Sequence, residues 1–308
     1  MQNTPPLPQI QQKLVELESQ NLQLQQTLTQ VINAHNRLAN TTAKLTPQAF
    51  LNIMQFSLVE HCNLNCFGCS VFSQHADAKF YNIKEFEKEV KHLAKLTDGL
   101  IGHFELQGGE PLLHPQINEF LVILRKYFPE SGIWIITNGI LLPKQKDDFW
   151  ETCRDNKVEI HPTKYPIKID WQKVSQKCQT YGIPLIFYGG SEIQKVSWKF
   201  NLEPKGNLNP FNSFVGCLMA NVCTSVKEGK LYACGIPANI HIFNKKFNQN
   251  LKVSKLDYLD LYKVKDYAEI LHFVAKPLPF CRYCDVAKWY QGREWQASKK
   301  DISEYYDV

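Results

Sequence analysis

The chain has 308 residues, of which 44% are apolar and 21% are charged, and its formal net charge is +5. This composition is typical of a globular protein with one large domain and a smaller appendage. The basic residues are scattered, which excludes the basic stripe of a nucleic-acid-binding protein. No apolar run approaches the roughly 20 residues of a transmembrane helix, and the amino-terminal segment lacks an apolar signal core. We therefore expect a cytoplasmic protein with no membrane or nucleic-acid partner.

Residues 1–46 differ from the rest of the chain and predict a helical coiled-coil segment. Their apolar residues alternate at spacings of three and four, as in a heptad seam. One core set is Leu14, Asn21, Leu28 and His35, and the other is Leu17, Leu24, Val31 and Leu38. A single Asn at such a position often selects a parallel dimer. The segment is expected to join two copies in a homodimer, to pack on its own domain, or to fray as a tail.

Residues 47–204 alternate between strand-like and helix-like segments. The expected strands are 51–60, 101–106, 132–137, 158–162, 183–188 and 196–200. The expected helices lie near 83–96, from Pro115 onward, near 143–155 and at 170–182. Such alternation predicts an α/β fold with a parallel sheet covered by helices, in which ligands bind at the carboxyl ends of the strands. Residues 205–308 break the pattern and predict a small module, with a hairpin around 227–229 and a helix near 259–274.

Ten cysteines are many for a cytoplasmic chain, in which structural disulfides are disfavoured. Eight of them form two groups: Cys62, Cys66 and Cys69, and then Cys217, Cys223, Cys234, Cys281 and Cys284. Cys153 and Cys178 stand apart, in helical register with apolar residues, and are expected in the core.

The first cysteine group directly follows the first expected strand. Thiolates select zinc, copper(I) or iron–sulfur clusters. Three thiolates leave one iron of a [4Fe–4S] cluster open to a ligand, whereas structural zinc usually takes a closed set of four. The segment from Gln107 to Pro111, with Gly108, Gly109 and Glu110 at its centre, follows the second strand, so the two loops should lie side by side. We expect its glycines to let a ligand approach the backbone.

Cys62-x3-Cys66-x2-Cys69 followed by Gly108-Gly109-Glu110 resembles the radical S-adenosylmethionine (radical SAM) superfamily, whose fold is a partial (β/α)6 barrel. The resemblance implies that the three cysteines hold a [4Fe–4S] cluster whose fourth iron chelates SAM. It implies that the Gly-Gly-Glu segment binds the methionyl amino group of SAM. Thr137 and Asn138, after the third strand, match positions that often contact the ribose or methionyl part of SAM.

One position departs from the pattern of this family. Many members place an aromatic residue just before the third cysteine, where it helps to position the adenine of SAM. Here Gly68 occupies that position and Phe67 precedes it. Phe67 is therefore the candidate for this contact, which stays open.

The second cysteine group is similar to the twitch or SPASM extensions of radical SAM enzymes, which carry auxiliary iron–sulfur clusters. Five cysteines suffice for one auxiliary [4Fe–4S] cluster. A twitch-like set uses Cys217, Cys234, Cys281 and Cys284 and leaves Cys223 as a hydrogen-atom donor, whereas a SPASM-like site recruits Cys223 with Cys217 and Cys234. A hairpin cysteine pair with a distant Cys-x-x-Cys also makes a zinc ribbon, which is the alternative.

The resemblance implies reductive cleavage of SAM to a 5′-deoxyadenosyl radical, which abstracts hydrogen from a small substrate. The electron donor is expected to be a low-potential protein such as flavodoxin or ferredoxin. Segments 109–115, 137–139 and 164–167 resemble a subgroup associated with surface polysaccharides, which favours a sugar or nucleotide sugar and dehydrogenation or epimerisation. Residues 161–165 should face the barrel mouth, in a substrate role or as solvated loop. The alternatives are a peptide-modifying radical SAM enzyme, a zinc-binding scaffold and an electron-transfer protein.

Overall fold

The computed structural model describes residues 6–190, 195–292 and 294–306. By its contacts the chain divides into two units, Met1–Leu45 and Thr46–Val308. The first unit contains one long helix, α1 (Leu7–Leu45), as the heptad pattern predicts. No residue of α1 is buried, so its apolar seam lies on the surface of the helix. The pairing of α1 with a second copy and the boundary at residue 204 stay predictions.

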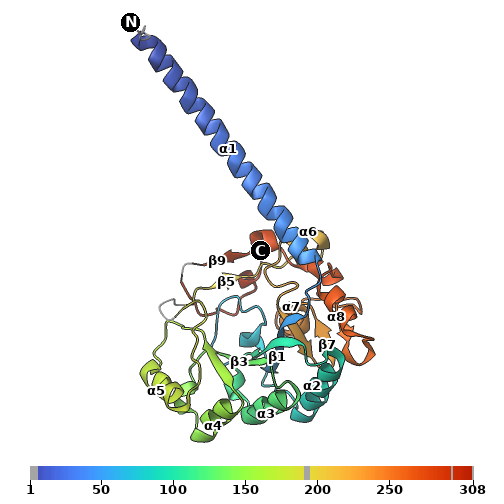
Figure 1. The fold of residues 1–308 in the computed structure, drawn as a ribbon. Helices are drawn as coiled ribbons and strands as arrows, with labels where there is room; N and C mark the ends of the chain where they lie inside the picture. The colour runs from blue at the N-terminus through green and yellow to red at the C-terminus, as the bar shows by residue number, and fades with distance from the viewer. Residues whose placement is uncertain (1–5, 191–194, 293, 307–308) are drawn as a thin grey trace. The chain divides into compact units, whose positions relative to one another are not determined.

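The second unit is built on a seven-stranded sheet (Figure 1). In spatial order its strands are β4 (Val158–Pro162), β3 (Gly132–Thr137), β2 (Ile101–Gly108), β1 (Leu51–Val59), β6 (Thr224–Lys227), β7 (Lys230–Tyr232) and β8 (Leu259–Asp260). The first five strands are mutually parallel, β7 pairs antiparallel with β6, and β8 pairs antiparallel with β7. The predicted α/β class and the first four predicted strands are therefore confirmed.

The fifth and sixth predicted strands differ from the prediction. Segment 183–188 lies beside β4 and forms backbone hydrogen bonds with it, but it makes only one parallel bridge, between Ile160 and Leu185. Segment 196–200 contains only β5 (Trp198–Lys199), which pairs with β9 (Tyr290–Gln291) outside the main sheet. On the side of β1 that does not pair with β2, the neighbouring strand is β6, which is the first strand of the predicted hairpin around residues 227–229. An apolar run shows that a segment is extended, but not which strand it will pair with.

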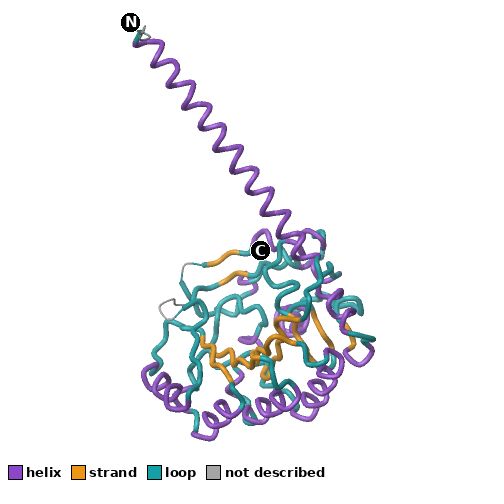
Figure 2. The backbone as a smooth tube through the Cα atoms, viewed as in Figure 1, coloured by secondary structure: helices purple, strands orange, loops and turns teal. Residues whose placement is uncertain are grey.

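Four helices lie along one face of the sheet, as Figures 1 and 2 show: α2 (Ile83–Thr97), α3 (Ile117–Tyr127), α4 (Asp147–Asp155) and α5 (Trp171–Tyr181). The remaining helices are α6 (Pro210–Val215), α7 (Gly235–Phe247) and α8 (Tyr267–Val274). Helix α3 begins two residues later than predicted, because Pro115 and Gln116 form the turn before it. The helix predicted at 259–274 is shorter, because β8 and a 3-10 turn take up its first residues.

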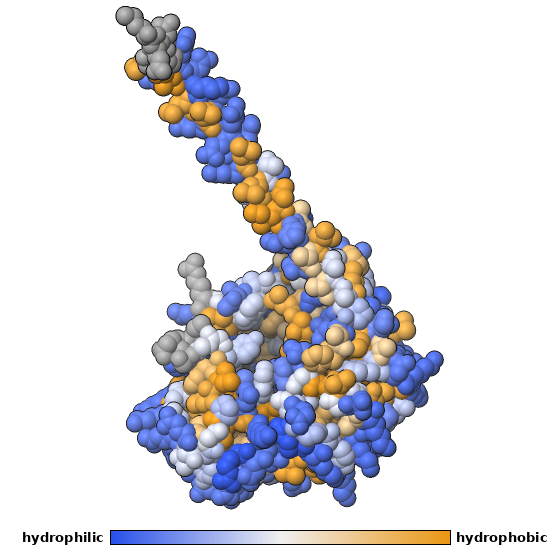
Figure 3. Space-filling model, in the orientation of Figure 1, coloured by the Kyte–Doolittle hydropathy of each residue, from blue (hydrophilic) through white to orange (hydrophobic). Residues whose placement is uncertain are grey.

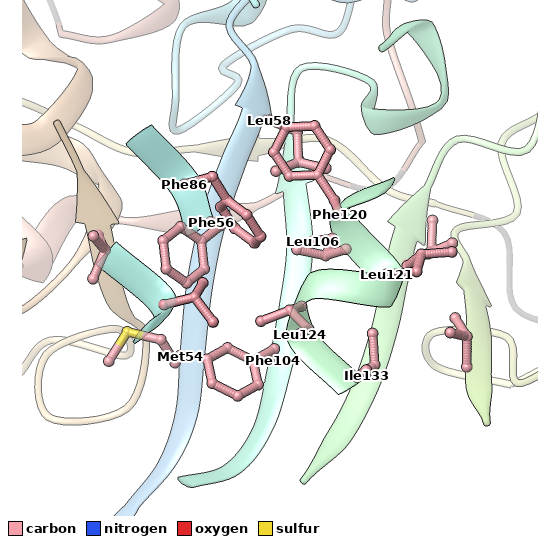
Figure 4. Packing of buried hydrophobic residues seen from close by; sticks show 14 of the residues in the cluster. Met54, Phe56, Leu58, Phe86, Phe104, Leu106, Phe120, Leu121, Leu124 and Ile133 are labelled. Carbon is pink, nitrogen blue, oxygen red and sulfur yellow. The ribbon is translucent and has the colours of Figure 1, made fainter. Parts of the chain in front are cut away.

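The main core lies between the sheet and helices α2, α3, α4 and α5 (Figure 4). Phe56 of β1 packs on Phe86 of α2, and Phe86 packs on Phe120 of α3, with ring centroids 4.8 Å and 4.6 Å apart. Cys153 and Cys178 are buried in this core, as predicted. Since side chains alternate along a strand, the residues between these core positions point to the opposite face, here called the inner face of the sheet. No helix in the described ranges is long and apolar enough to cross a membrane.

Candidate functional site

The first cysteine group lies on the loop that follows β1, here called the cysteine loop (residues 60–70). Cys62, Cys66 and Cys69 are half-buried. The Sγ atom of Cys62 accepts a hydrogen bond from the amide of Leu64 at 3.4 Å and one from Nδ2 of Asn138 at 3.6 Å. Burial raises the pKa of the Cys62 thiol to about 12, and burial likewise raises the pKa of Cys66. A metal that binds here must therefore displace protons.

The two glycines before Glu110 allow the cysteine loop to approach the end of β2. A Cβ atom on Gly109 would stand 1.8 Å from the carbonyl oxygen of His61. Gly108 has φ +127°, and a Cβ there would stand 2.3 Å from the carbonyl oxygen of Val59. Gly109 also donates its amide to Val59 at 2.7 Å. The space that a Cβ would take at both glycines is filled by backbone of the chain itself, and the approach of a ligand to this backbone stays a prediction.

Glu110 joins the ends of β2 and β3. Its side chain is fully buried and accepts hydrogen bonds from the Thr137 hydroxyl at 2.7 Å and the Asn138 amide at 2.9 Å. A third bond comes from the Leu112 amide at 3.1 Å. Burial raises the pKa of Glu110 to about 7, against the pull of these donors. Asn138 in turn reaches Cys62, so the predicted cofactor residues and the cysteine loop form one network.

Gly68 has a local structural reason for being glycine. Its φ is +60°, in the left-handed region, and a Cβ there would stand 2.2 Å from the carbonyl oxygen of Trp198. Its amide donates to the carboxylate of Glu304. An aromatic side chain cannot be placed here without moving the loop. Phe67, the alternative candidate, is half-buried, and its amide donates to Gln296.

Three further side chains, only one of them considered from the sequence, surround Cys66. Tyr165 and Trp295 both act to lower the pKa of the Cys66 thiol, against the larger effect of its burial, and their rings meet edge to face at 6.0 Å. Lys195 is close enough to Cys66 and Cys69 for their charges to act on it, while burial lowers its pKa. Tyr165 was expected at the barrel mouth, but Lys195 and Trp295 carry no local sequence signal, because they reach the site from distant segments.

A row of polar and aromatic side chains crosses the inner face of the sheet, here called the inner-face row. Its members are Gln55, His103, Glu105, Trp134, Glu159, His161 and Ser225. Gln55 accepts a hydrogen bond from Ser225 at 3.2 Å and donates one to Glu105 at 2.7 Å. The Trp134 ring stacks between His103 at 3.6 Å and His161 at 4.2 Å, and His161 contacts Glu159 at 2.8 Å. The row therefore joins carboxylate, amide, hydroxyl and imidazole groups to an aromatic ring on one face of the sheet.

The second cysteine group gathers around one apolar cavity. Cys217, Cys234, Cys281 and Cys284 all line this cavity. Its other walls are apolar, including Phe214, Ile236 and Trp289. Cys223 is half-buried and is not among the lining residues, although its charge acts on Cys234. The structure thus brings together the four cysteines of the twitch-like set.

The two cysteine groups adjoin the sheet at different positions along the length of β1. The cysteine loop leaves the carboxyl end of β1, whereas Cys223 and Cys234 flank the β6–β7 hairpin. Thr224 pairs with Met54, and Tyr232 pairs with Ser225, so this hairpin opens at the level of the amino half of β1. The inner-face row crosses the strands between these two positions, at Gln55 of β1.

The donor types decide what these groups can hold. Within residues 6–190, 195–292 and 294–306, no three His, Cys, Asp or Glu side chains converge as ligands of a single metal ion would. A four-iron cube binds each thiolate through a different iron, so its ligands stand further apart than those of one ion. Three soft thiols on one loop, and four around one apolar cavity, fit iron–sulfur ligation.

Comparisons with known proteins agree with this chemistry. A model of the family described as the radical SAM superfamily matches residues 56–164. GTP 3′,8-cyclase of Sulfurovum sp. (strain NBC37-1) is 26% identical over 94 residues, which are 30% of this chain and 29% of that protein. The antilisterial bacteriocin subtilosin biosynthesis protein AlbA of Bacillus subtilis (strain 168) is 31% identical over 99 residues, which are 32% of this chain and 21% of AlbA.

The chain thus spans less than a third of the length of these relatives. A crystal structure of BtrN in complex with AdoMet and 2-DOIA aligns with 77% of this chain and 94% of that chain, at 14% identity and a TM-score of 0.48. Residues 56–164 of the chain thus match the radical SAM superfamily.

Proposed function

We propose that the chain is an enzyme that cleaves SAM reductively and uses the resulting radical to abstract hydrogen from a small substrate. The observation that carries the proposal is the network at the carboxyl edge of the sheet. There the carboxylate of Glu110 accepts the amide of Asn138, and the side chain of Asn138 reaches the Sγ atom of Cys62 on the cysteine loop. In this proposal Cys62, Cys66 and Cys69 hold a [4Fe–4S] cluster. When bound, such a cluster supplies the electron that breaks the sulfonium carbon–sulfur bond of SAM.

Glu110 is suited to bind the amino group of the cofactor. A carboxylate offers about four acceptor positions, and three of those of Glu110 are occupied by donors of the chain. The remaining position fits one ammonium hydrogen. A cation there would also balance a negative charge that burial disfavours. Thr137 and Asn138 hold the carboxylate in place, and Gly108 and Gly109 keep it close to the cysteine loop.

The apolar cavity of the second group supports one auxiliary [4Fe–4S] cluster on Cys217, Cys234, Cys281 and Cys284. Cys223 then keeps its thiol outside the ligand set. Cys223 directly precedes β6 and lies two positions before Ser225, whose hydroxyl contacts Gln55 on the inner face. Cys223 is therefore the candidate hydrogen-atom donor for an epimerisation. Solvent deuterium in the product, lost in Cys223→Ser, would support this role; its persistence in that variant would contradict it.

The inner-face row supports a hydroxyl-rich substrate such as a sugar or nucleotide sugar. Glu105, His161 and Gln55 offer polar atoms within the sheet, where a polar ligand must be matched group by group. The test is to add a panel of nucleotide sugars to the reduced enzyme and to measure 5′-deoxyadenosine. A substrate should raise its formation above the uncoupled rate. Stimulation only by peptides would instead favour a peptide-modifying enzyme.

Helix α1 supports a homodimer. Leu7 and Ile10 extend the heptad seam toward the amino terminus, and Figure 3 shows apolar side chains along the helix. In a parallel, in-register pair Asn21 meets its own copy, and Lys13 of one helix lies opposite Glu18 of the other. An antiparallel pair would instead place Asn21 against an apolar residue of the second core set, such as Leu24 or Val31. We therefore propose parallel pairing.

The dimer is tested with a substitution in the seam and one outside it. Leu24→Glu should convert a dimer into a monomer in light scattering after gel filtration, since it puts two carboxylates into the seam. Gln26→Glu, on the opposite side of the helix, should leave the mass unchanged. A monomeric unsubstituted chain would contradict the pairing.

The central experiment is anaerobic reconstitution of the full chain with iron and sulfide. The unsubstituted protein, reduced by dithionite or by flavodoxin or ferredoxin, should form 5′-deoxyadenosine from SAM. The variant with Cys62, Cys66 and Cys69 all replaced by alanine should lose this activity, and its iron content should fall by the iron of one [4Fe–4S] cluster. Cleavage of SAM by that variant would overturn the proposed function.

A further inference from the structure

Residues 294–306, here called the strap, run along the cysteine loop. Ala297 forms an antiparallel bridge with Cys66. The amide of Phe67 donates to the carbonyl of Gln296 at 2.9 Å, and the amide of Ser298 donates to the carbonyl of Asn65 at 3.0 Å. Backbone groups that flank Cys66 on both sides are therefore bonded to the strap.

Glu304 holds the next part of the loop. It is 2% exposed, and its Oε2 atom accepts the amide hydrogen bond of Gly68 at 3.3 Å. Its Oε1 atom accepts from the Ser298 hydroxyl at 2.9 Å and from the Lys299 amide at 2.6 Å. One buried carboxylate thus fixes the turn of the strap and the backbone between Cys66 and Cys69.

Tyr305 fixes the strap and the third cysteine together. Its ring is fully buried and packs on Phe72 and Phe243 at 5.2 Å and 5.3 Å. Its hydroxyl donates to the carbonyl of Cys69 at 3.2 Å and accepts from Gln74 at 2.6 Å. The Tyr305 hydroxyl therefore ties the carbonyl of Cys69 to the core around Phe72 and Phe243.

We propose that the strap positions Cys66 and Cys69 for cluster binding, with Glu304 and Tyr305 as positioning residues. The inference rests on the proposed function, because it assumes that these cysteines hold the cluster. Metal–ligand distances in a well-formed site stay within about 0.2 Å of their typical values. A short loop with a glycine at φ +60° does not hold such a geometry by itself, whereas bonds to a buried partner do.

The test measures how firmly the first group holds its iron. The full chain is reconstituted anaerobically and challenged with an iron chelator, and the reduced cluster is followed by electron paramagnetic resonance. Glu304→Ala leaves the buried amide of Gly68 without its acceptor, which should speed iron loss about tenfold. Glu304→Gln keeps an acceptor oxygen and should lose iron more slowly than Glu304→Ala. Asp301→Ala is the control, since Asp301 is exposed on the same strap and caps only Ser303.

Tyr305→Phe keeps the ring packing and removes only the hydroxyl, with its bonds to Cys69 and Gln74, so the variant should fold normally and lose iron a few-fold faster. Equal iron loss in all these variants would overturn the role of the strap. The variant with all three loop cysteines replaced by alanine separates the two proposals. If it binds less iron than the unsubstituted chain while Glu304→Ala and Tyr305→Phe match the control, only the strap is refuted. If it binds as much iron as the unsubstituted chain, the proposed function fails as well.

Discussion

Gly68→Ala tests whether the backbone of the cysteine loop determines iron binding. An alanine at φ +60° carries the strain of the left-handed region, about 1–2 kcal/mol. Its Cβ would also stand 2.2 Å from the Trp198 carbonyl oxygen, and Cβ atoms in proteins essentially never come closer than 3.0 Å to a neighbour. The loop or the backbone of Trp198 must therefore move by roughly 0.8 Å, which is several times the spread of about 0.2 Å expected in metal–ligand distances.

Gly182→Ala provides a matched control. Gly182 follows α5 with φ +66°, and no atom lies within 4 Å of the position of its Cβ. This variant carries the backbone strain alone, so its free energy of unfolding in urea should fall by about 1–2 kcal/mol with iron binding intact. Gly68→Ala should in addition lose the iron of the first group and the formation of 5′-deoxyadenosine. Equal iron contents in the two variants would refute the reasoning.

Three further outcomes are expected. Glu110→Gln should weaken SAM binding by about 10- to 100-fold in calorimetry, because it removes a charged partner of the cofactor; an unchanged affinity would contradict that contact. Burial lowers the pKa of His75 to about 4, so the unfolded state binds more protons between that pH and about 6.5. Stability should therefore fall as the pH falls through this window, and His75→Phe should flatten the dependence in thermal unfolding. Phe120→Ala should cost about 3–5 kcal/mol in urea unfolding, since the ring is fully buried; a loss below 1 kcal/mol would contradict the described packing.

The local parts of this site could be predicted from the sequence. Parallel strands bring their carboxyl ends to one edge, so the loops at Cys62 and Glu110 were expected side by side, and the bond between Gly109 and Val59 confirms this. Capping by Asn82 and the periodicity of α2 and α5 are also local, and these helices were predicted within a residue or two.

Contacts between distant segments could not be predicted. Gly68 was recognised as a departure from the family pattern, but its reason lies in the carbonyl of Trp198, 130 positions further along the chain. The insertion of β6 beside β1 was missed for the same cause, since a hairpin pattern does not show which strand it will join. The partners of the cysteine loop in residues 296–305 are even more distant, and no pattern around Cys66 indicates them.

The bond between Glu304 and Gly68 spans 236 positions of the chain, which has a consequence for the order of maturation. The cysteine loop is synthesised early, but its last partners leave the ribosome much later, and contacts of high sequence separation form slowly. A nascent chain that has released only the sheet has its three thiols without their final spacing. Iron delivery should therefore succeed after synthesis has passed residue 305, and a stalled shorter chain should remain without metal at this loop.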